Sequence, residues 1–332
     1  MSNHPEKPIA ILGAGAWGTA LALYLARRDQ QVHLWSIETP QVEAMIAERT
    51  NQQYLPGYPF PETLHPEMDL AKAIASADDI LVAVPSVGYR DTLTQLKPLL
   101  SPAHRFLCAT KGMDMEKGQL LHDTMRKLLG ARYPYAVLSG PSFAKEVAAG
   151  LPTAVVIASH DEPFAQALRT RFSSPLFRID LSKDITGVEI GGVVKNVLAI
   201  AAGISDGMKL GANARSTLIT RGLNEMIALG TALGADSKTF EGLAGLGDLI
   251  LTCTDDLSRN RRFGLALGKS MPKDQAEREI GQVVEGKRNA ELVVQLAQRH
   301  SVKMRICETV HHILQNKVTA QEAMQDIFAG ES

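Results

Sequence analysis

The stretch that decides the fold is "IAILGAGAWGTALALYLA", residues 9–26. It places Gly13, Gly15 and Gly18 in a G-x-G-x-x-G pattern, directly after a short apolar run and at the start of a helical one. In this context the first glycine allows a tight turn, the second lets a pyrophosphate approach the backbone, and the third lets helix and strand pack closely. The helix N-terminus then faces the phosphates. The stretch therefore predicts a dinucleotide-binding domain.

The same stretch carries no charge and is long enough to resemble a signal peptide or a membrane span. Its three glycines, the Arg27–Arg28 pair that follows at once, and the lack of a small-residue cleavage site before that pair do not fit an exported segment. We therefore expect no membrane span there.

Short apolar runs alternate with helical patterns over the first half of the chain, which is typical of a doubly wound, mostly parallel Rossmann sheet. The expected strands are 9–12, 32–35, 80–84, 105–109, 136–139, 153–158 and 177–179. After about Ile185 the patterns are helical only. We therefore predict a dinucleotide-binding Rossmann domain over residues 1–186 and an all-helical substrate-binding domain over residues 187–332. The proline-rich stretch 54–61 is expected to be a surface loop of the first domain.

Composition bears on partners and location. The 332 residues include 35 lysines and arginines and 36 aspartates and glutamates, which leaves a net charge of −1. This balance argues against a nucleic-acid or anionic-membrane partner, which would require a strongly basic surface. The three cysteines form no C-x-x-C pair, so we expect no disulfide framework, no metal site and a reducing cytoplasm. An all-helical half of this size commonly offers an apolar face for a two-fold contact, so we also expect a homodimer.

The end of the second expected strand bears on the choice of cofactor. NAD-binding folds place an acidic side chain there for the ribose hydroxyls, whereas a basic residue accommodates the 2′-phosphate of NADP. This chain has Trp35, Ser36 and Ile37 at that point, and Glu38 comes late. Ile37 is a candidate cofactor contact, and the choice between NAD and NADP stays open.

Two other strand ends carry residues suited to a ligand. Ligands of such sheets bind at the carboxyl ends of the strands. Lys111 follows one strand and precedes a glycine, and Ser139-Gly140-Pro141-Ser142 follows another. Lys111 is either a ligand-binding or an ordinary exposed lysine. The 139–142 segment is either an anion site at a helix start or a plain turn with a helix cap.

Lys195 stands in the apolar helical stretch "GVEIGGVVKNVLAIAAG", residues 187–203. A lysine desolvated among small apolar side chains has a lowered pKa and becomes a usable base near neutrality. The alternative is a lysine that extends to the surface from the flank of a helix. The glycine pair one turn earlier and the adjacent Asn196 favour the first interpretation. No histidine stands in any of the glycine-rich or strand-end motifs, so Lys195 is the predicted proton acceptor.

A dense polar segment, "GLAGLGDLILTCTDDLSRNRRFG", covers residues 242–264. It contains Asp248 after a glycine pair and then Ser258-Arg259-Asn260. The planar guanidinium of arginine suits a phosphate because it donates two parallel charge-assisted hydrogen bonds. The segment also fits a solvated basic loop balanced by Asp255 and Asp256, and its spacing alone does not decide between the two.

Taken together, these motifs closely resemble the bacterial NAD(P)-dependent sn-glycerol-3-phosphate dehydrogenases. The resemblance extends over nearly the whole chain from Ile9 to beyond Gly286, and the 242–264 segment is its most specific element. Further matching elements are "ATKG", "SGPSFAKE", "GLPTA", "GGVVKNVLAI", "GANARSTLITRGLNEM" and "GQVVEG". The resemblance implies a 6-phosphogluconate dehydrogenase-like fold. It also implies reversible oxidation of sn-glycerol 3-phosphate to dihydroxyacetone phosphate, which supplies glycerol 3-phosphate for phospholipid synthesis.

The resemblance also implies roles for individual residues. NAD or NADP contacts would fall at Ala16, Trp17, Lys111, Ala144, Arg259, Val283 and Glu285, beside the three glycines. Substrate contacts would fall at Lys111, Gly140, Ser142, Lys195, Asp248, Ser258, Arg259 and Asn260, with Lys195 as the proton acceptor. Members of the family often carry His or Arg just after the second-strand tryptophan, whereas this chain has Ser36-Ile37, which leaves an NADP preference open.

Two other functions compete with this interpretation. One is another hydroxy-acid or sugar-acid dehydrogenase with a helical second domain, which would not predict the 242–264 segment. The other is a non-catalytic dinucleotide sensor, which needs no desolvated lysine and would carry a basic DNA-binding element. Oxidation of NADH or NADPH with dihydroxyacetone phosphate distinguishes all three.

Overall fold

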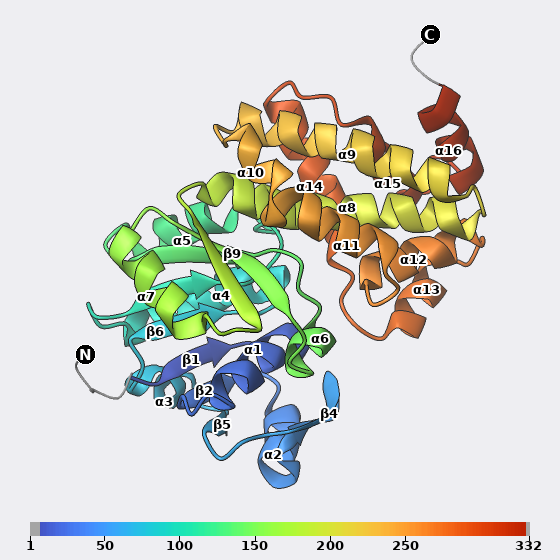
Figure 1. Ribbon diagram of the computed structural model, residues 1–332. Helices are drawn as coiled ribbons and strands as arrows, with labels where there is room; N and C mark the ends of the chain where they lie inside the picture. Colours follow the sequence, from blue (N-terminus) through green and yellow to red (C-terminus); the bar gives the residue numbers. More distant parts are fainter. Residues whose placement is uncertain (1–6, 330–332) are drawn as a thin grey trace. The chain divides into compact units, whose positions relative to one another are not determined.

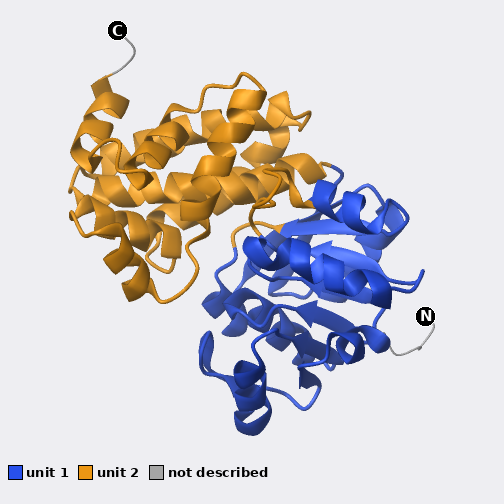
Figure 2. Ribbon diagram, turned by 180° about the vertical axis from the view of Figure 1, so that it is seen from behind, with its two compact units in different colours: residues 1–110, 122–138, 142–183 blue, residues 111–121, 139–141, 184–332 orange. Residues whose placement is uncertain are grey.

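The computed structural model describes residues 7–329, and the chain forms two compact units (Figure 2). Unit 1 comprises residues 1–110, 122–138 and 142–183, and unit 2 comprises residues 111–121, 139–141 and 184–332. Two short segments that lie next to sheet strands in the sequence therefore belong to the second unit. The domain boundary expected after residue 186 stays a prediction.

Unit 1 is built on one eight-stranded sheet with the strand order β10-β9-β8-β7-β6-β1-β2-β5 (Figure 1). The central strand β1 pairs in parallel with both β2 and β6, so that Ile9 lies opposite Val32 and Asp79. The strands are β1 (Ile9–Leu12), β2 (Val32–Trp35), β5 (Leu64–Glu67), β6 (Asp79–Val82), β7 (Arg105–Cys108), β8 (Tyr135–Ser139), β9 (Thr153–Ser159) and β10 (Phe177–Ser182). This confirms the predicted parallel Rossmann sheet, whose short apolar strands are buried beneath helices.

Helices alternate with these strands along the chain, as the sequence predicts. They are α1 (Ala16–Ala26), α2 (Thr39–Glu48), α3 (Leu70–Ala75), α4 (Ser86–Leu96), α5 (Leu121–Leu129), α6 (Ala144–Ala148) and α7 (Glu162–Phe172), with a 3₁₀ turn at Lys97–Leu99. α3 and α7 begin at aspartate caps, since Asp69 accepts from the backbone N–H of Ala71 and Asp161 from that of Phe164.

Two features of unit 1 differ from the sequence-based expectation. The stretch 54–61 is not simply a surface loop, because β4 (Leu55–Pro59) pairs with β3 (Thr50–Asn51) in a small antiparallel hairpin. The edge strand β5 was not expected either, since it contains Pro66. A proline is tolerated there because an edge strand needs hydrogen bonds on one side only, and proline and glycine otherwise indicate turns.

Unit 2 is helical: none of the described residues from 184 to 329 forms a strand. Its helices are α8 (Ile185–Gly207), α9 (Ala212–Ala232), α10 (Ser237–Glu241), α11 (Asp248–Thr254), α12 (Arg259–Gly268), α13 (Lys273–Ile280), α14 (Glu285–Arg299), α15 (Arg305–Leu314) and α16 (Ala320–Ala329). A π-helical turn at Leu243–Gly247 leads directly into α11. The predicted all-helical second half is confirmed.

The long helix α8 is the core of unit 2. Among the described residues it alone is long and apolar enough to span a membrane, and its apolar stretch is entirely buried inside the protein. Its glycines allow α12 to approach backbone to backbone: a Cβ on Gly203 would lie 2.2 Å from the Arg261 carbonyl oxygen. A Cβ on Gly264 would likewise lie 2.1 Å from the carbonyl oxygen of Ile200. This close packing holds the start of α12 against the helix that carries Lys195.

Candidate active site

The glycine turn of unit 1 lies between β1 and α1, as predicted. Gly13 has a φ of +112°, and a Cβ there would come within 2.7 Å of the Val84 backbone nitrogen. A Cβ on Gly18 would lie 2.0 Å from the Gly13 carbonyl oxygen, so this glycine allows the close packing of helix on turn. A Cβ on Gly15 would meet no atom within 4 Å. The turn is therefore closed at its first and third glycines and open at the second, where a pyrophosphate approaches in such folds.

Other side chains near this turn also fit a dinucleotide. Ala16 and Trp17 form the first turn of α1, and the Trp17 indole N–H is buried without a hydrogen-bond partner. Ile37 follows β2 and is 71% exposed, and Ala144 begins α6. The open N-terminus of α1 and this unpaired donor are suited to an anionic cofactor.

The end of β2 is internally hydrogen-bonded. The Ser36 hydroxyl donates to Gln41 Oε1 over 2.7 Å and accepts from the Glu38 backbone N–H over 3.2 Å. The Glu38 carboxylate accepts from the Tyr54 hydroxyl at 2.9 Å. These contacts occupy the hydrogen of Ser36, so its hydroxyl provides no spare donor for a ribose or a 2′-phosphate.

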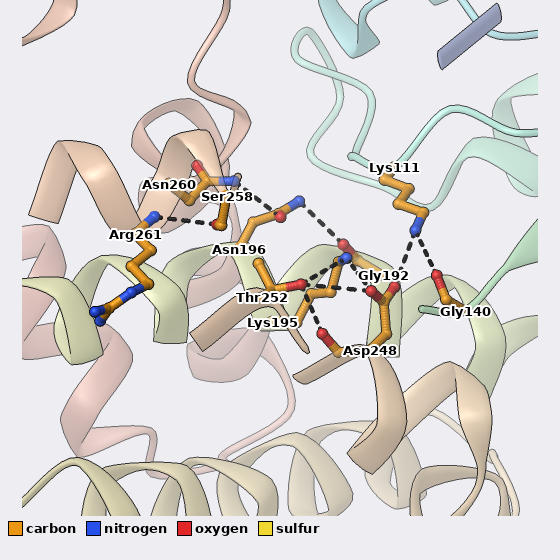
Figure 3. Close-up of polar contacts among 10 residues, drawn as sticks. All are labelled: Lys111, Gly140, Gly192, Lys195, Asn196, Asp248, Thr252, Ser258, Asn260 and Arg261. Atoms are coloured by element: carbon orange, nitrogen blue, oxygen red, sulfur yellow. Dashed lines mark hydrogen bonds and ion pairs between the residues drawn. The ribbon is translucent and has the colours of Figure 1, made fainter. Parts of the chain in front are cut away.

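A carboxylate held between two lysines forms the centre of the site in unit 2 (Figure 3). The Lys111 ammonium donates to Asp248 Oδ2 at 2.9 Å and to the Gly140 carbonyl oxygen at 3.0 Å. The Lys195 ammonium donates to the other carboxylate oxygen, Oδ1, and to the Thr252 hydroxyl at 3.0 Å. The side chains of Lys195 and Asp248 are only 7% and 1% exposed. Two cations thus share one buried anion.

Burial governs the protonation of this group. It lowers the pKa of Lys195 to about 7, while the Asp248 carboxylate opposes this shift and the Lys111 ammonium adds to it. Burial by itself raises the pKa of Asp248, but the charges of Lys111 and Lys195 outweigh it and hold that pKa below its ordinary value. Near neutrality Asp248 is therefore ionised, and Lys195 readily gains and loses a proton.

Glycines explain why Asp248 lies beside Lys195. A Cβ on Gly191 would come within 2.2 Å of the Ala244 carbonyl oxygen, so α8 and the π-helical turn touch through their backbones. Asp248 begins α11 immediately after that turn, and Thr252 follows one helical turn later on the same face. The sequence motif contains Thr252, but its hydrogen bond to Lys195 was not predicted, because it depends on how two distant helices pack.

The start of α12 is a second polar cluster. Ser258 caps this helix by accepting from the Arg261 backbone N–H at 3.2 Å. The buried Asn260 amide donates to Asn196 Oδ1 at 2.9 Å and accepts from the Gly286 backbone N–H at 2.8 Å. The Asn196 amide in turn donates to the Gly192 carbonyl oxygen at 3.1 Å. This chain of amides fixes the orientation of Asn260 against α8.

The arginines of the "SRNRR" segment have different surroundings. Arg259 is half-buried and donates to Gln282 Oε1 at 3.3 Å. Burial lowers the pKa of Arg259, and the nearby Glu285 carboxylate opposes that shift. Arg261 is buried and forms ion pairs with Asp206 and Asp256, so it contributes to the packing of unit 2. Gln282, which the sequence analysis did not single out, is thus a neighbour of the candidate phosphate arginine.

The predicted site residues divide between the two units. Unit 1 contains Gly13, Gly15, Ala16, Trp17, Gly18, Ile37, Ser142 and Ala144. Unit 2 contains Lys111, Gly140, Lys195, Asp248, Ser258, Arg259, Asn260, Val283 and Glu285. Within unit 2 the structure brings Lys111, Lys195, Asp248 and Gly140 together. Across residues 7–329 no cluster of three or more His, Cys, Asp or Glu side chains is arranged to hold a metal ion.

Lys111 was expected after the carboxyl end of a strand, and its chain segment leaves the sheet after β7. Residues 111–121 belong to unit 2, where Met113 and Leu120 are part of the helical core. Arg299 of α14 donates to the Gly118 carbonyl oxygen in the same segment. Lys111 is therefore positioned by the helical unit that also carries Lys195.

Comparison with known proteins gives a consistent result along the chain. Residues 8–165 match the family described as the N-terminus of NAD-dependent glycerol-3-phosphate dehydrogenase, and residues 184–325 match its C-terminus. A Haemophilus ducreyi protein named glycerol-3-phosphate dehydrogenase (NAD(P)+) is 52% identical over 315 residues, which cover 95% of this chain and 94% of that protein. A protein of the same name from Salmonella paratyphi B is 52% identical over 322 residues, covering 97% and 95% of the two chains.

Solved structures agree with these matches. The crystal structure of a glycerol-3-phosphate dehydrogenase from Coxiella burnetii has a TM-score of 0.96 at 50% identity, covering 98% of this chain and 100% of that one. A ketopantoate reductase from Ralstonia eutropha, with a TM-score of 0.59 and 19% identity over 96% of this chain and 99% of its own, shares the fold alone.

Proposed function

This chain belongs to the NAD-dependent glycerol-3-phosphate dehydrogenase family, and on that premise we propose that it interconverts sn-glycerol 3-phosphate and dihydroxyacetone phosphate. The observation that supports this most is the buried Lys195–Asp248–Lys111 group in the same unit as the polar start of α12. The lysine–aspartate group can exchange a proton with an alcohol oxygen, and the start of α12 can hold a phosphate.

Lys195 is the proton-transfer group in this proposal. A nicotinamide cofactor held at the glycine turn would supply hydride transfer to and from the alcohol carbon. The neutral amine of Lys195 accepts the alcohol proton, and in the reverse direction its ammonium donates a proton to the carbonyl oxygen. Asp248 stabilises the ammonium form in both directions. Lys111 holds the second carboxylate oxygen and supplies a positive charge that stabilises negative charge on the substrate oxygen.

The start of α12 binds the substrate phosphate in this proposal. The Arg259 guanidinium supplies charge-assisted hydrogen bonds, and the Ser258 hydroxyl and the Asn260 amide supply neutral ones. The first turn of a ten-residue helix adds backbone N–H groups and a partial positive charge. Gly140 and Ser142 are further proposed substrate contacts.

The proposed cofactor contacts are those of the glycine turn and those that the family resemblance implies. Gly13, Gly15, Ala16, Trp17 and Gly18 would hold the pyrophosphate and its neighbourhood, with Ile37 on the adenosine side. The remaining proposed contacts are Lys111, Ala144, Arg259, Val283 and Glu285. The open position at Gly15 and the unpaired Trp17 N–H support this assignment.

The direct test is oxidation of NADH and NADPH by the purified protein with dihydroxyacetone phosphate, and with a 2-oxo acid as the comparison. Turnover with dihydroxyacetone phosphate but not with the 2-oxo acid supports the proposal. Turnover with the 2-oxo acid alone would instead establish a hydroxy-acid dehydrogenase, and cofactor binding without turnover a sensor. We place the enzyme in the cytoplasm, where it would supply glycerol 3-phosphate for phospholipid synthesis.

Both cofactors are expected to work, with kcat/KM values within about a hundredfold of each other. The end of β2 offers neither an acidic residue placed for the ribose nor an arginine, and the Ser36 hydrogen is already used by Gln41. A single neutral hydrogen bond shifts such a preference by roughly tenfold or less. Arg259, if it reaches the adenosine side, would favour NADPH. The measurement is the kcat/KM ratio at one fixed concentration of dihydroxyacetone phosphate. A larger ratio in either direction would reveal a selecting residue elsewhere.

We also expect a homodimer, because a helical unit of this size commonly buries an apolar face in a two-fold contact. Light scattering at micromolar concentration should give about twice the 35.9 kDa mass of one chain. A mass equal to that of one chain at every concentration tested would contradict this expectation.

A further inference from the structure

Ser139 is a buried hydroxyl that has no hydrogen-bond partner. It ends β8, is only 2% exposed, and its Oγ atom makes no hydrogen bond in the structure. An unpaired buried hydroxyl costs free energy, because the group has lost its water without gaining a protein partner. One explanation for such an atom is that a bound ligand provides its hydrogen-bond partner.

The Ser139 hydroxyl lies against the same face of α8 that carries the proton-transfer lysine. A Cβ on Gly192 would lie 3.0 Å from Ser139 Oγ and 3.7 Å from Lys111 Cγ. Gly192 precedes Lys195 by three residues and Asn196 by four, so these residues occupy one face of the helix. The unpaired hydroxyl is therefore about one helical turn from the Lys195–Asp248 pair, on the side of Lys111.

The site has a clear order along α8 (Figure 3). Ser258 and Asn260, the proposed phosphate ligands, lie at the side of Asn196, and Lys111 and Gly140 lie at the opposite side, with Lys195 between them. Dihydroxyacetone phosphate has its phosphate on one terminal carbon, its carbonyl in the middle and a hydroxyl on the other terminal carbon. With the phosphate at α12 and the carbonyl at Lys195, the terminal hydroxyl points to the side where Ser139 lies.

We infer that the Ser139 hydroxyl binds the terminal hydroxyl of the substrate and determines specificity for it. The inference rests on the proposed function and goes beyond it by assigning the end of the substrate remote from the phosphate. A serine hydroxyl both donates and accepts, so it matches a substrate hydroxyl. A site that hydrogen-bonds a substrate hydroxyl rejects an analogue that lacks it, because its own polar group is then left unpaired.

The test compares Ser139→Ala with the wild-type enzyme on dihydroxyacetone phosphate and on acetol phosphate, which lacks only the terminal hydroxyl. In the variant, kcat/KM for dihydroxyacetone phosphate should fall about tenfold, the effect of one lost hydrogen bond. The kcat/KM for acetol phosphate should stay unchanged. The preference for dihydroxyacetone phosphate over acetol phosphate should therefore shrink about tenfold. The melting temperature should stay the same or rise, because an unpaired buried hydroxyl is removed.

Ser205→Ala is the matched control. Ser205 lies in α8, is fully buried, and its hydroxyl also has no partner. The same substitution there should leave both activities and the preference unchanged. Ser139→Cys keeps the size of the side chain with a weaker hydrogen-bonding group, and its preference should fall between those of wild type and Ser139→Ala.

An unchanged preference in Ser139→Ala would overturn the inference. Equal losses on both substrates together with a lower melting temperature would also overturn it, because they would show that Ser139 only packs against Gly192. A wild-type enzyme that does not reduce dihydroxyacetone phosphate would overturn the proposed function instead, so the two failures are distinct.

Discussion

Replacing Lys195 by alanine is expected to lower kcat about 100- to 10,000-fold, the usual contribution of a general acid–base group. The lysine is buried, bonded to Asp248 and Thr252, and has a pKa of about 7, so it is the group best placed to exchange a proton near neutrality. Cofactor affinity should stay close to wild type, because the glycine turn is untouched. Steady-state kinetics and a separate measurement of NADH binding provide the test.

The pH dependence gives this prediction a second readout. Oxidation of glycerol 3-phosphate requires the neutral amine of Lys195, so kcat should rise with pH through about 7. Reduction of dihydroxyacetone phosphate requires the ammonium, so that rate should fall over the same range. Lys195→Arg keeps a positive charge that does not titrate there, and it should remain as inactive as the alanine variant. A Lys195→Ala enzyme with near wild-type kcat would remove this residue from the mechanism.

Arg259→Ala is expected to lower kcat/KM for dihydroxyacetone phosphate about 100-fold. The substitution removes charge-assisted hydrogen bonds to the phosphate, and each such bond contributes about 1.5–3 kcal/mol. Because Arg259 is half-buried, water replaces the lost partner poorly. Inhibition by inorganic phosphate should weaken in parallel, since that ion uses the same guanidinium. Initial rates over a series of substrate and phosphate concentrations measure both effects.

Arg262→Ala is the matched control for this change. Arg262 lies in the same helix with its side chain exposed, so its loss removes one positive charge without removing a buried donor. It should change kcat/KM only slightly, and that change should disappear at high salt. If Arg259→Ala leaves the KM values of both substrate and cofactor unchanged, the start of α12 is a solvated basic segment and holds no phosphate.

Most of the fold was predictable from the sequence alone, because the signals for its core strands and helices are local. The G-x-G-x-x-G pattern needs only neighbouring residues to form a turn, and the alternating apolar runs correspond to β1, β2 and the other core strands. The desolvation of Lys195 was also predictable, since the small and apolar residues around it belong to the same helix. The β3–β4 hairpin and the edge strand β5 were missed, because their prolines and glycine indicate turns unless an edge position makes them tolerable.

The tertiary structure decided which of the candidate residues meet. Lys111 and Asp248 are 137 positions apart, and Lys195 and Asp248 are 53 apart, so no local pattern predicts that one carboxylate bridges both ammonium groups. That contact depends on the backbone approach of α8 to the π-helical turn and on the segment 111–121 packing into the helical core. The same long-range packing gives two nearby arginines different partners. Arg261 pairs with Asp206, whereas Arg259 donates to Gln282. Residue types and periodicity thus determined the elements and the chemistry available to them. Only the packing of distant elements, which buries charged side chains beside one another, determined which of these side chains pair.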